Sequence, residues 1–231
     1  MRAKKILLRA CAVVLIVIMP WFLALTSIFP LISSPFLHLQ YARPDVPPSS
    51  KFTPQERQAF AEAAAHYLAS REGIEYLADL RDDQGLPLFN ERELTHMVDV
   101  KVLLWRAIAL DIVFGLLLIG SLGILLSERE TRNKIPSYLL TGSLVTLALC
   151  ISTIIVVPLQ FRFFFVEFHH VFFIGDTWLF PRSDTLIQLF PEMFWFDALQ
   201  SWIVLIIVVA MALGAGTYVW MRRKGRSVVS S

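Results

Sequence analysis

The chain is poor in charge, and this shortage decides its broad class. Only 17% of its 231 residues are charged, whereas 56% are hydrophobic. This balance is too apolar for an ordinary soluble domain and indicates a membrane protein. The net charge of +2 is also too small to indicate a nucleic-acid partner.

Cysteine and the common catalytic motifs are equally scarce. The two cysteines, Cys11 and Cys150, both fall inside apolar runs. A disulfide framework is therefore excluded, and both are expected to be small packing residues. The sequence has no Gly-x-Ser-x-Gly elbow and no phosphate-binding loop, so serine-nucleophile chemistry has no support.

Long apolar runs, by contrast, are abundant. Three of them carry no charge, and a fourth is interrupted only by Arg106 and Asp111. Each is close to the roughly 20 residues with which a helix crosses a bilayer, and the alternation of a transmembrane barrel is missing. We predict an all-α integral membrane protein with four transmembrane helices, a long helical outer loop after the first span and an aromatic interfacial segment before the fourth. Residues 1–231 are expected to form a single membrane domain, with spans at about 8–30, 103–127, 136–158 and 198–221.

Basic residues predict the orientation of these spans, because Lys and Arg mark the cytoplasmic side. They gather at the N-terminus, after the second span and in the C-terminal tail, and these places share one side if four spans alternate. We therefore expect a multi-pass protein of the cell (cytoplasmic) membrane with both termini in the cytoplasm. The first span is expected to be an uncleaved signal anchor. Segments 31–102 and 159–197 then face outward and carry the active site.

The first outer segment contains several local signals. Its opening part, 30–48, holds five prolines and is expected to be extended and not helical. Thr53 and Glu56 flank Pro54 as a capping box, which predicts a helix to about residue 70. A turn is expected at 82–87, and a further helix is expected to begin near Asn90.

A polar stripe is expected where that last helix enters the second span. If the helix continues unbroken from about 91 to 126, its polar side chains fall within an arc of roughly 140°; they are Glu93, His96, Asp99, Arg106 and Asp111. Ionisable residues at membrane depth normally face the bundle interior or a wet cavity, so the stripe should face inward. The structural alternative is that Arg106 snorkels to the interface and pairs with Asp111.

Histidines at the outer face suggest chemistry. His96 begins the stripe, and His169 and His170 lie in the aromatic second outer segment on the same side. Two histidines held beside acidic residues indicate acid/base catalysis at the level of the lipid headgroups. Zinc binding by His96, His169, Glu93 and Asp99 is only weakly indicated, because no His-x-x-x-His or His-Glu-x-x-His spacing occurs. We expect neither a metal nor a cofactor.

Two segments carry a resemblance to a known family. The first is 89–101, with the core His96-Met97-x-Asp99-Val100-Lys101. The second is 168–173, followed by Asp176, Trp178, Asp184 and the Leu-Phe-Pro of 189–191. Together they resemble the lipoprotein intramolecular transacylase (Lit) family of bacterial four-span integral membrane proteins. The four-span order and the long first outer segment match too, so the resemblance covers nearly the whole chain.

The resemblance implies a membrane-embedded acyltransferase. Its reaction moves the sn-2 acyl chain of a diacylglyceryl lipoprotein to the α-amino group of the N-terminal cysteine and leaves a lyso-form lipoprotein. His96 and His169 are implied as the catalytic pair. His96 is expected to be the base, oriented by Glu93 or Asp99, and His169 the acid or oxyanion donor, although the two roles can be exchanged. The substrate-binding residues are expected to be Arg106, Phe172, Phe173 and Trp178. The expected partners are membrane lipids and diacylglyceryl lipoproteins, with no nucleic acid and no obligate protein partner.

Other functions stay open on the sequence alone. One is a histidine-dependent acyltransferase or hydrolase that acts on another lipid, and another is a metal-dependent membrane enzyme. A third is a non-enzymatic scaffold or small transporter that uses the stripe as a proton path. A transporter predicts polar residues on several spans, yet the other three runs carry no charge.

Overall fold

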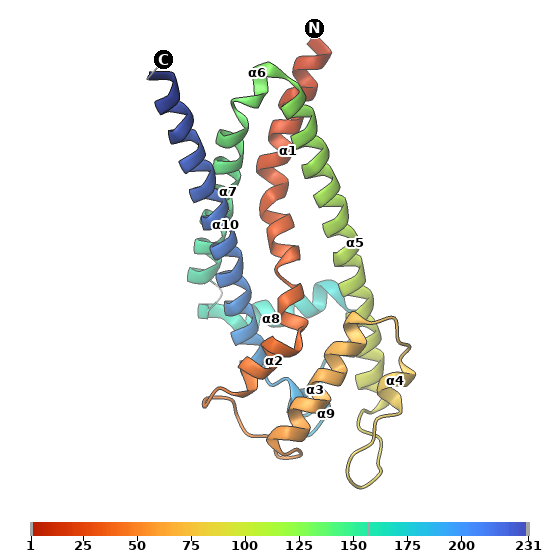
Figure 1. Cartoon of the computed structure of the whole chain (residues 1–231). Helices are drawn as coiled ribbons and strands as arrows, with labels where there is room; N and C mark the ends of the chain where they lie inside the picture. Colours follow the sequence, from red (N-terminus) through yellow and green to blue (C-terminus); the bar gives the residue numbers. More distant parts are fainter. Residues whose placement is uncertain (1, 157, 230–231) are drawn as a thin grey trace. The chain divides into compact units, whose positions relative to one another are not determined.

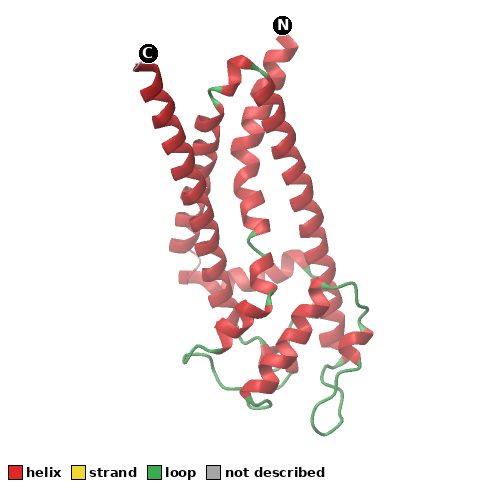
Figure 2. Cartoon of the chain, in the orientation of Figure 1, coloured by secondary structure: helices red, strands yellow, loops and turns green. Residues whose placement is uncertain are grey.

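The computed structural model describes residues 2–156 and 158–229. Over these ranges the regular structure is helical and no strand forms (Figure 2). Four helices are long and apolar enough to cross a membrane, judged by length and composition. The predicted all-α, four-span architecture is confirmed. The chain divides into two compact units, one made of 1–27, 108–156 and 202–231 and the other of 28–107 and 157–201.

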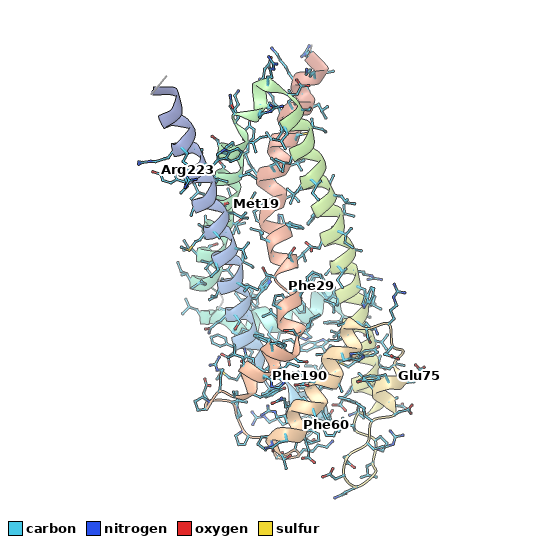
Figure 3. All side chains as sticks on the ribbon, viewed as in Figure 1. Met19, Phe29, Phe60, Glu75, Phe190 and Arg223 are labelled. Carbon is cyan, nitrogen blue, oxygen red and sulfur yellow. The ribbon has the colours of Figure 1, made fainter. Side chains whose placement is uncertain are left out.

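The first unit is built from long apolar helices (Figure 1). It contains α1 (Arg2–Thr26), the later part of α5 (Glu91–Ser127), α6 (Arg129–Arg132), α7 (Ile135–Val156) and the later part of α10 (Glu192–Val229). Helices α1 and α7 pack closely at Gly142. A Cβ there would lie 2.9 Å from Met19 Sδ and 3.3 Å from the Leu15 carbonyl oxygen, so the contact requires glycine (Met19 is labelled in Figure 3).

Segments predicted to share one side of the membrane share one end of this unit. The start of α1, helix α6 and the later part of α10 lie together at that end (Figure 1). Lys4 near the start of α1 forms a 2.8 Å ion pair with Glu128, just before α6. That this end is cytoplasmic stays a prediction.

The second unit includes the two segments predicted to face outward. It contains η1 (Phe29–Ile32), α2 (Ser34–Tyr41), α3 (Pro54–Ala69), α4 (Glu75–Ala78), the first part of α5, η2 (Pro158–Gln160), α8 (Phe161–Phe172), α9 (Thr185–Leu189) and the first part of α10. Its main core buries Phe52, Tyr67 and Leu189, with Phe60 and Phe190 packed against them (Figure 3). Burial of such side chains stabilises the unit by about 1.5–3 kcal/mol each.

The local predictions for the first outer segment have mixed outcomes. The extended conformation expected for 30–48 is wrong at its start, where η1 and α2 form. Pro30 and Pro35 sit in the first turns of these helices, where the backbone N–H has no helical acceptor and proline is tolerated. The Thr53 capping box is confirmed, because Thr53 Oγ1 accepts from the backbone N–H of Glu56 and the Glu56 carboxylate accepts from the backbone N–H of Thr53.

Candidate active site

Helix α5 carries the first histidine and begins at a well-defined cap. The backbone N–H of Asn90 donates to Glu93 Oε2 at 2.9 Å, and the backbone N–H of Glu93 donates to Asn90 Oδ1 at 3.0 Å. This reciprocal pair satisfies two N–H groups at the helix start. The helix then runs unbroken from Glu91 to Ser127, which confirms the predicted continuous helix. His96 lies one turn past the cap and is only 9% exposed.

Glu93 has a structural partner far along the chain. Its side chain is almost fully buried, and Oε1 accepts the backbone N–H of Leu186 at 2.7 Å. Leu186 lies in the first turn of α9, so Glu93 joins the start of α5 to the start of α9. Both carboxylate oxygens are therefore engaged by backbone donors. The structure describes no hydrogen bond between Glu93 and His96.

His169 comes from the last turn of α8 and is also 9% exposed. After α8 the chain reverses through Gly175, whose φ of 70° is a left-handed conformation that glycine adopts without strain. The reversal returns Trp178 to His169, with ring centres 4.6 Å apart and planes at 32°. Phe165, one turn before His169 on α8, contacts its imidazole with ring centres 4.3 Å apart.

The two histidines lie side by side in the second unit. The ring centres of His96 and His169 are 6.1 Å apart, and their planes are only 21° from parallel. Phe173 lies against both rings, 4.9 Å from that of His96 and 5.4 Å from that of His169. Phe180 adds an edge contact to His96 at 5.4 Å. The pair thus sits in an aromatic enclosure, which lowers the local dielectric and strengthens any hydrogen bond made inside it.

The surroundings of His169 fix its tautomer and its charge. Its Nδ1 lies 2.6 Å from the carbonyl oxygen of Phe165. A carbonyl only accepts, so Nδ1 carries the hydrogen and Nε2 keeps its lone pair. Burial lowers the pKa of His169 from 6.5, and the nearby charge of His170 lowers it further against the opposing effect of the Phe165 hydrogen bond. Burial therefore favours the neutral imidazole of His169 at neutral pH, with Nε2 available as a base.

Two residues of this site, and Thr177 next to Trp178 in the chain, have buried polar atoms without partners in the described structure. His96 Nδ1, Thr177 Oγ1 and Trp178 Nε1 are all buried, and none has a hydrogen-bond partner among the described residues. Buried polar atoms are normally satisfied, so an unpartnered atom beside the histidine pair is a candidate contact for a ligand.

The remaining predicted site residues are placed less centrally. Asp99 is half-buried, and the described structure gives it no hydrogen bond to His96. Arg106 and Phe172 are exposed. Arg106 does not pair with Asp111 in the described residues; instead Thr26 Oγ1 donates to Asp111 at 3.0 Å. His170 is exposed and lies 3.8 Å from Glu167.

Two aromatic neighbours of the pair were not singled out from the sequence. Phe165 precedes His169 by four residues, so helical spacing could have identified it. Phe180 is one of many aromatic residues in its segment, and no spacing rule distinguishes it. No group of three or more His, Cys, Asp or Glu side chains within 2–156 and 158–229 is arranged to hold a metal ion.

With this geometry established, comparison with known proteins identifies the family. The family model described as lipoprotein intramolecular transacylase Lit matches residues 12–195. The chain belongs to the Lit family. It is a multi-pass membrane protein and an acyltransferase, as the resemblance implied. The family is that of lipoprotein intramolecular transacylases.

The chain is also similar to individual known proteins. An uncharacterized protein of Aquifex aeolicus (strain VF5) is 30% identical over 187 residues, which cover 80% of this chain and 83% of that protein. An in meso structure of Lit from Bacillus cereus matches with a TM-score of 0.76 at 20% identity, over 95% of this chain and 98% of that one. A variant of the Bacillus cereus protein with one histidine replaced by arginine matches with a TM-score of 0.72 at 18% identity, over 98% of this chain and 97% of that one. These structural matches show the shared fold.

Proposed function

We propose that the chain moves the sn-2 acyl chain of a diacylglyceryl lipoprotein to the α-amino group of its N-terminal cysteine, using His96 and His169. The observation that carries this proposal is the stacked pair of buried histidines in an aromatic enclosure, 6.1 Å between ring centres. Because the amine and the ester belong to one substrate, their effective concentration is high and the reaction needs no protein nucleophile.

The reaction needs a base that accepts a proton from the amine and a group that returns a proton to the departing sn-2 oxygen. The α-ammonium, with a pKa of about 8, first loses one proton to solvent. The neutral amine then attacks the sn-2 carbonyl carbon, and a C–N bond forms while the carbonyl oxygen becomes an oxyanion. The second amine proton passes to a histidine. When the bond from carbon to the sn-2 oxygen breaks, that oxygen takes a proton from the histidine pair and leaves as an alcohol.

The tautomer of His169 supports an exchange of the roles expected from the sequence. Since Nδ1 is held by the Phe165 carbonyl, Nε2 is free to accept the amine proton. A lowered pKa keeps this base neutral, and it also favours rapid return of the proton. His169 Nε2 then returns this proton to the departing oxygen, and His96, with its ring centre 6.1 Å away, is the second histidine beside the reacting ester. In this assignment Glu93 is a positioning residue, because its carboxylate holds backbone N–H groups of Asn90 and Leu186.

Helix α8 supports the binding of acyl chains. One side of it presents His169 to the enclosure, while Phe163, Phe168 and Phe172 are about half exposed. An amphipathic helix with exposed aromatic residues is typical of the membrane interface. We place α8 in the outer headgroup region, where Phe172 contacts lipid, Phe173 and Trp178 line the enclosure, and Arg106 faces anionic headgroups. Asp99 is a half-buried residue one helical turn after His96, and we assign it no step of proton transfer.

The test is the chemistry of lipoprotein N-termini in cells with and without this protein. We expect mass spectrometry to show N-acyl, monoacylglyceryl cysteine only when the protein is present. Unchanged diacylglyceryl termini in both strains would contradict the reaction. Addition of chelator to purified protein tests the metal-dependent alternative, because loss of activity that zinc restores would reassign both histidines as ligands.

A further inference from the structure

The indole N–H of Trp178 is a second unused group beside His169. Trp178 is 7% exposed, and its Nε1 is buried without a hydrogen-bond partner in the described residues. Tryptophan nitrogen is a donor only, and buried indole N–H groups normally find an acceptor. Ring packing alone does not require an N–H group, so the unpartnered donor needs a separate explanation.

The tilted arrangement of the two rings limits which groups the indole N–H can reach. The Trp178 and His169 rings are 32° from parallel with centres 4.6 Å apart. The N–H lies in the plane of the indole, so it does not point into the face of the imidazole. The base nitrogen of His169 also lies in its own ring plane. Both groups therefore lie at ring edges, and a molecule that contacts the edges of these two tilted rings meets a base from one and a donor from the other.

Acyl transfer requires this combination. The amine proton goes to a base, while the carbonyl oxygen gains negative charge and needs a fixed donor. An indole N–H without a partner contributes no hydrogen bond to the free protein, but in an aromatic enclosure it can stabilise the charged intermediate strongly.

We infer that the indole N–H of Trp178 is the oxyanion donor, binding the former carbonyl oxygen of the migrating acyl group while His169 Nε2 takes the amine proton. This inference rests on the proposed function. It makes Trp178 a catalytic residue and leaves ring packing as its lesser role. Thr177 Oγ1, the neighbouring buried hydroxyl without a described partner, is placed next to it in the chain and can add a second donor.

The test uses the full-length protein in lipid and two replacements at one position. Trp178→Phe keeps an aromatic ring and removes the N–H. Incorporation of β-(3-benzothienyl)alanine at 178 keeps the two-ring shape and replaces N–H by sulfur. We expect either change to lower kcat by about 10²–10³-fold, as loss of one oxyanion donor does elsewhere, with KM nearly unchanged. The matched control is Trp105→Phe, which removes an indole donor to the Leu68 carbonyl at 3.2 Å outside the enclosure. Its activity per folded molecule should equal that of the unaltered protein.

Several outcomes would overturn the inference. Full activity in Trp178→Phe would remove the donor role. An active sulfur isostere beside an inactive Trp178→Phe would remove it too, because the two-ring shape would then suffice. A rise in KM without a fall in kcat would make Trp178 a binding residue. The acid limb of the pH profile should not move, because a structural effect on His169 would shift it. His169→Asn, assayed in parallel, separates the two claims: its full activity would refute the histidine base whatever Trp178 does.

Discussion

Replacement of Glu93 by alanine would separate a structural role for this carboxylate from a catalytic one. The side chain is almost fully buried and accepts the backbone N–H of Asn90 at 2.9 Å and that of Leu186 at 2.7 Å. Alanine removes both acceptors and leaves the Leu186 donor buried. Helix α9 then loses its link to α5, and the Glu93→Ala protein should be less stable.

The size of the loss follows from these bonds. Hydrogen bonds to a charged group contribute about 1.5–3 kcal/mol each, so two of them give roughly 3–6 kcal/mol. For a chain of this length, 1 kcal/mol corresponds to about 2–4 °C in Tm. Glu93→Ala is therefore expected to lower Tm by at least about 6 °C. Glu93→Gln keeps one carbonyl acceptor and should lose about half as much.

The assay is thermal unfolding in detergent, followed by turnover measured per folded molecule. Glu91→Ala is the control, because Glu91 is exposed in the first turn of the same helix. Its removal costs only the interaction with the helix dipole, about 0.3–1 kcal/mol. An unchanged Tm in Glu93→Ala together with a large loss of turnover would refute the structural role and restore Glu93 as a partner of the catalytic histidines.

Three further predictions follow from other parts of the chain. Since the pKa of His169 is lowered below 6.5, its base form persists as pH falls past 6.5; once kcat/KM is divided by the deprotonated fraction of the substrate amine, whose pKa is about 8, the corrected value should decline only below pH 6.5, and a decline of the corrected value above 6.5 would contradict this. Thr53→Ala should lower the free energy of unfolding by about 1 kcal/mol through loss of the α3 cap, measured by denaturation; an unchanged value would remove the cap's contribution. Ser50→Cys, without Cys11 and Cys150, should react with an impermeant thiol reagent on intact cells; labelling only after permeabilisation would reverse the orientation.

Features carried by short-range patterns could be predicted from the sequence. The continuous α5 and the capping box of Thr53 each depend on residues within a few turns of one another. The pairing of His96 with His169 was expected only because both lie on the predicted outer face and match segments of the Lit family. The structure adds the distance between them.

Long-range partners could not be predicted in this way. The Glu93 carboxylate bonds to Leu186, and Asp111 accepts from Thr26, in each case across a large separation along the chain. The sequence indicates that a buried charge needs a partner, but it does not say which one. The helices that contain Pro30 and Pro35 were missed for another reason. Proline breaks a helix in its interior, but it is tolerated in the first turn, where these two prolines lie.

The central claim is that the buried histidine pair performs the acyl transfer. Its most direct test is conversion of a synthetic diacylglyceryl lipopeptide to the N-acyl lyso form by His169→Asn and by His170→Asn, each compared with the unaltered protein. The two positions are adjacent, but His169 is buried against His96, whereas His170 is exposed. The account predicts that His169→Asn loses about 10²–10⁴-fold in kcat while remaining folded, and that His170→Asn stays close to the unaltered protein. Full turnover by folded His169→Asn would contradict it.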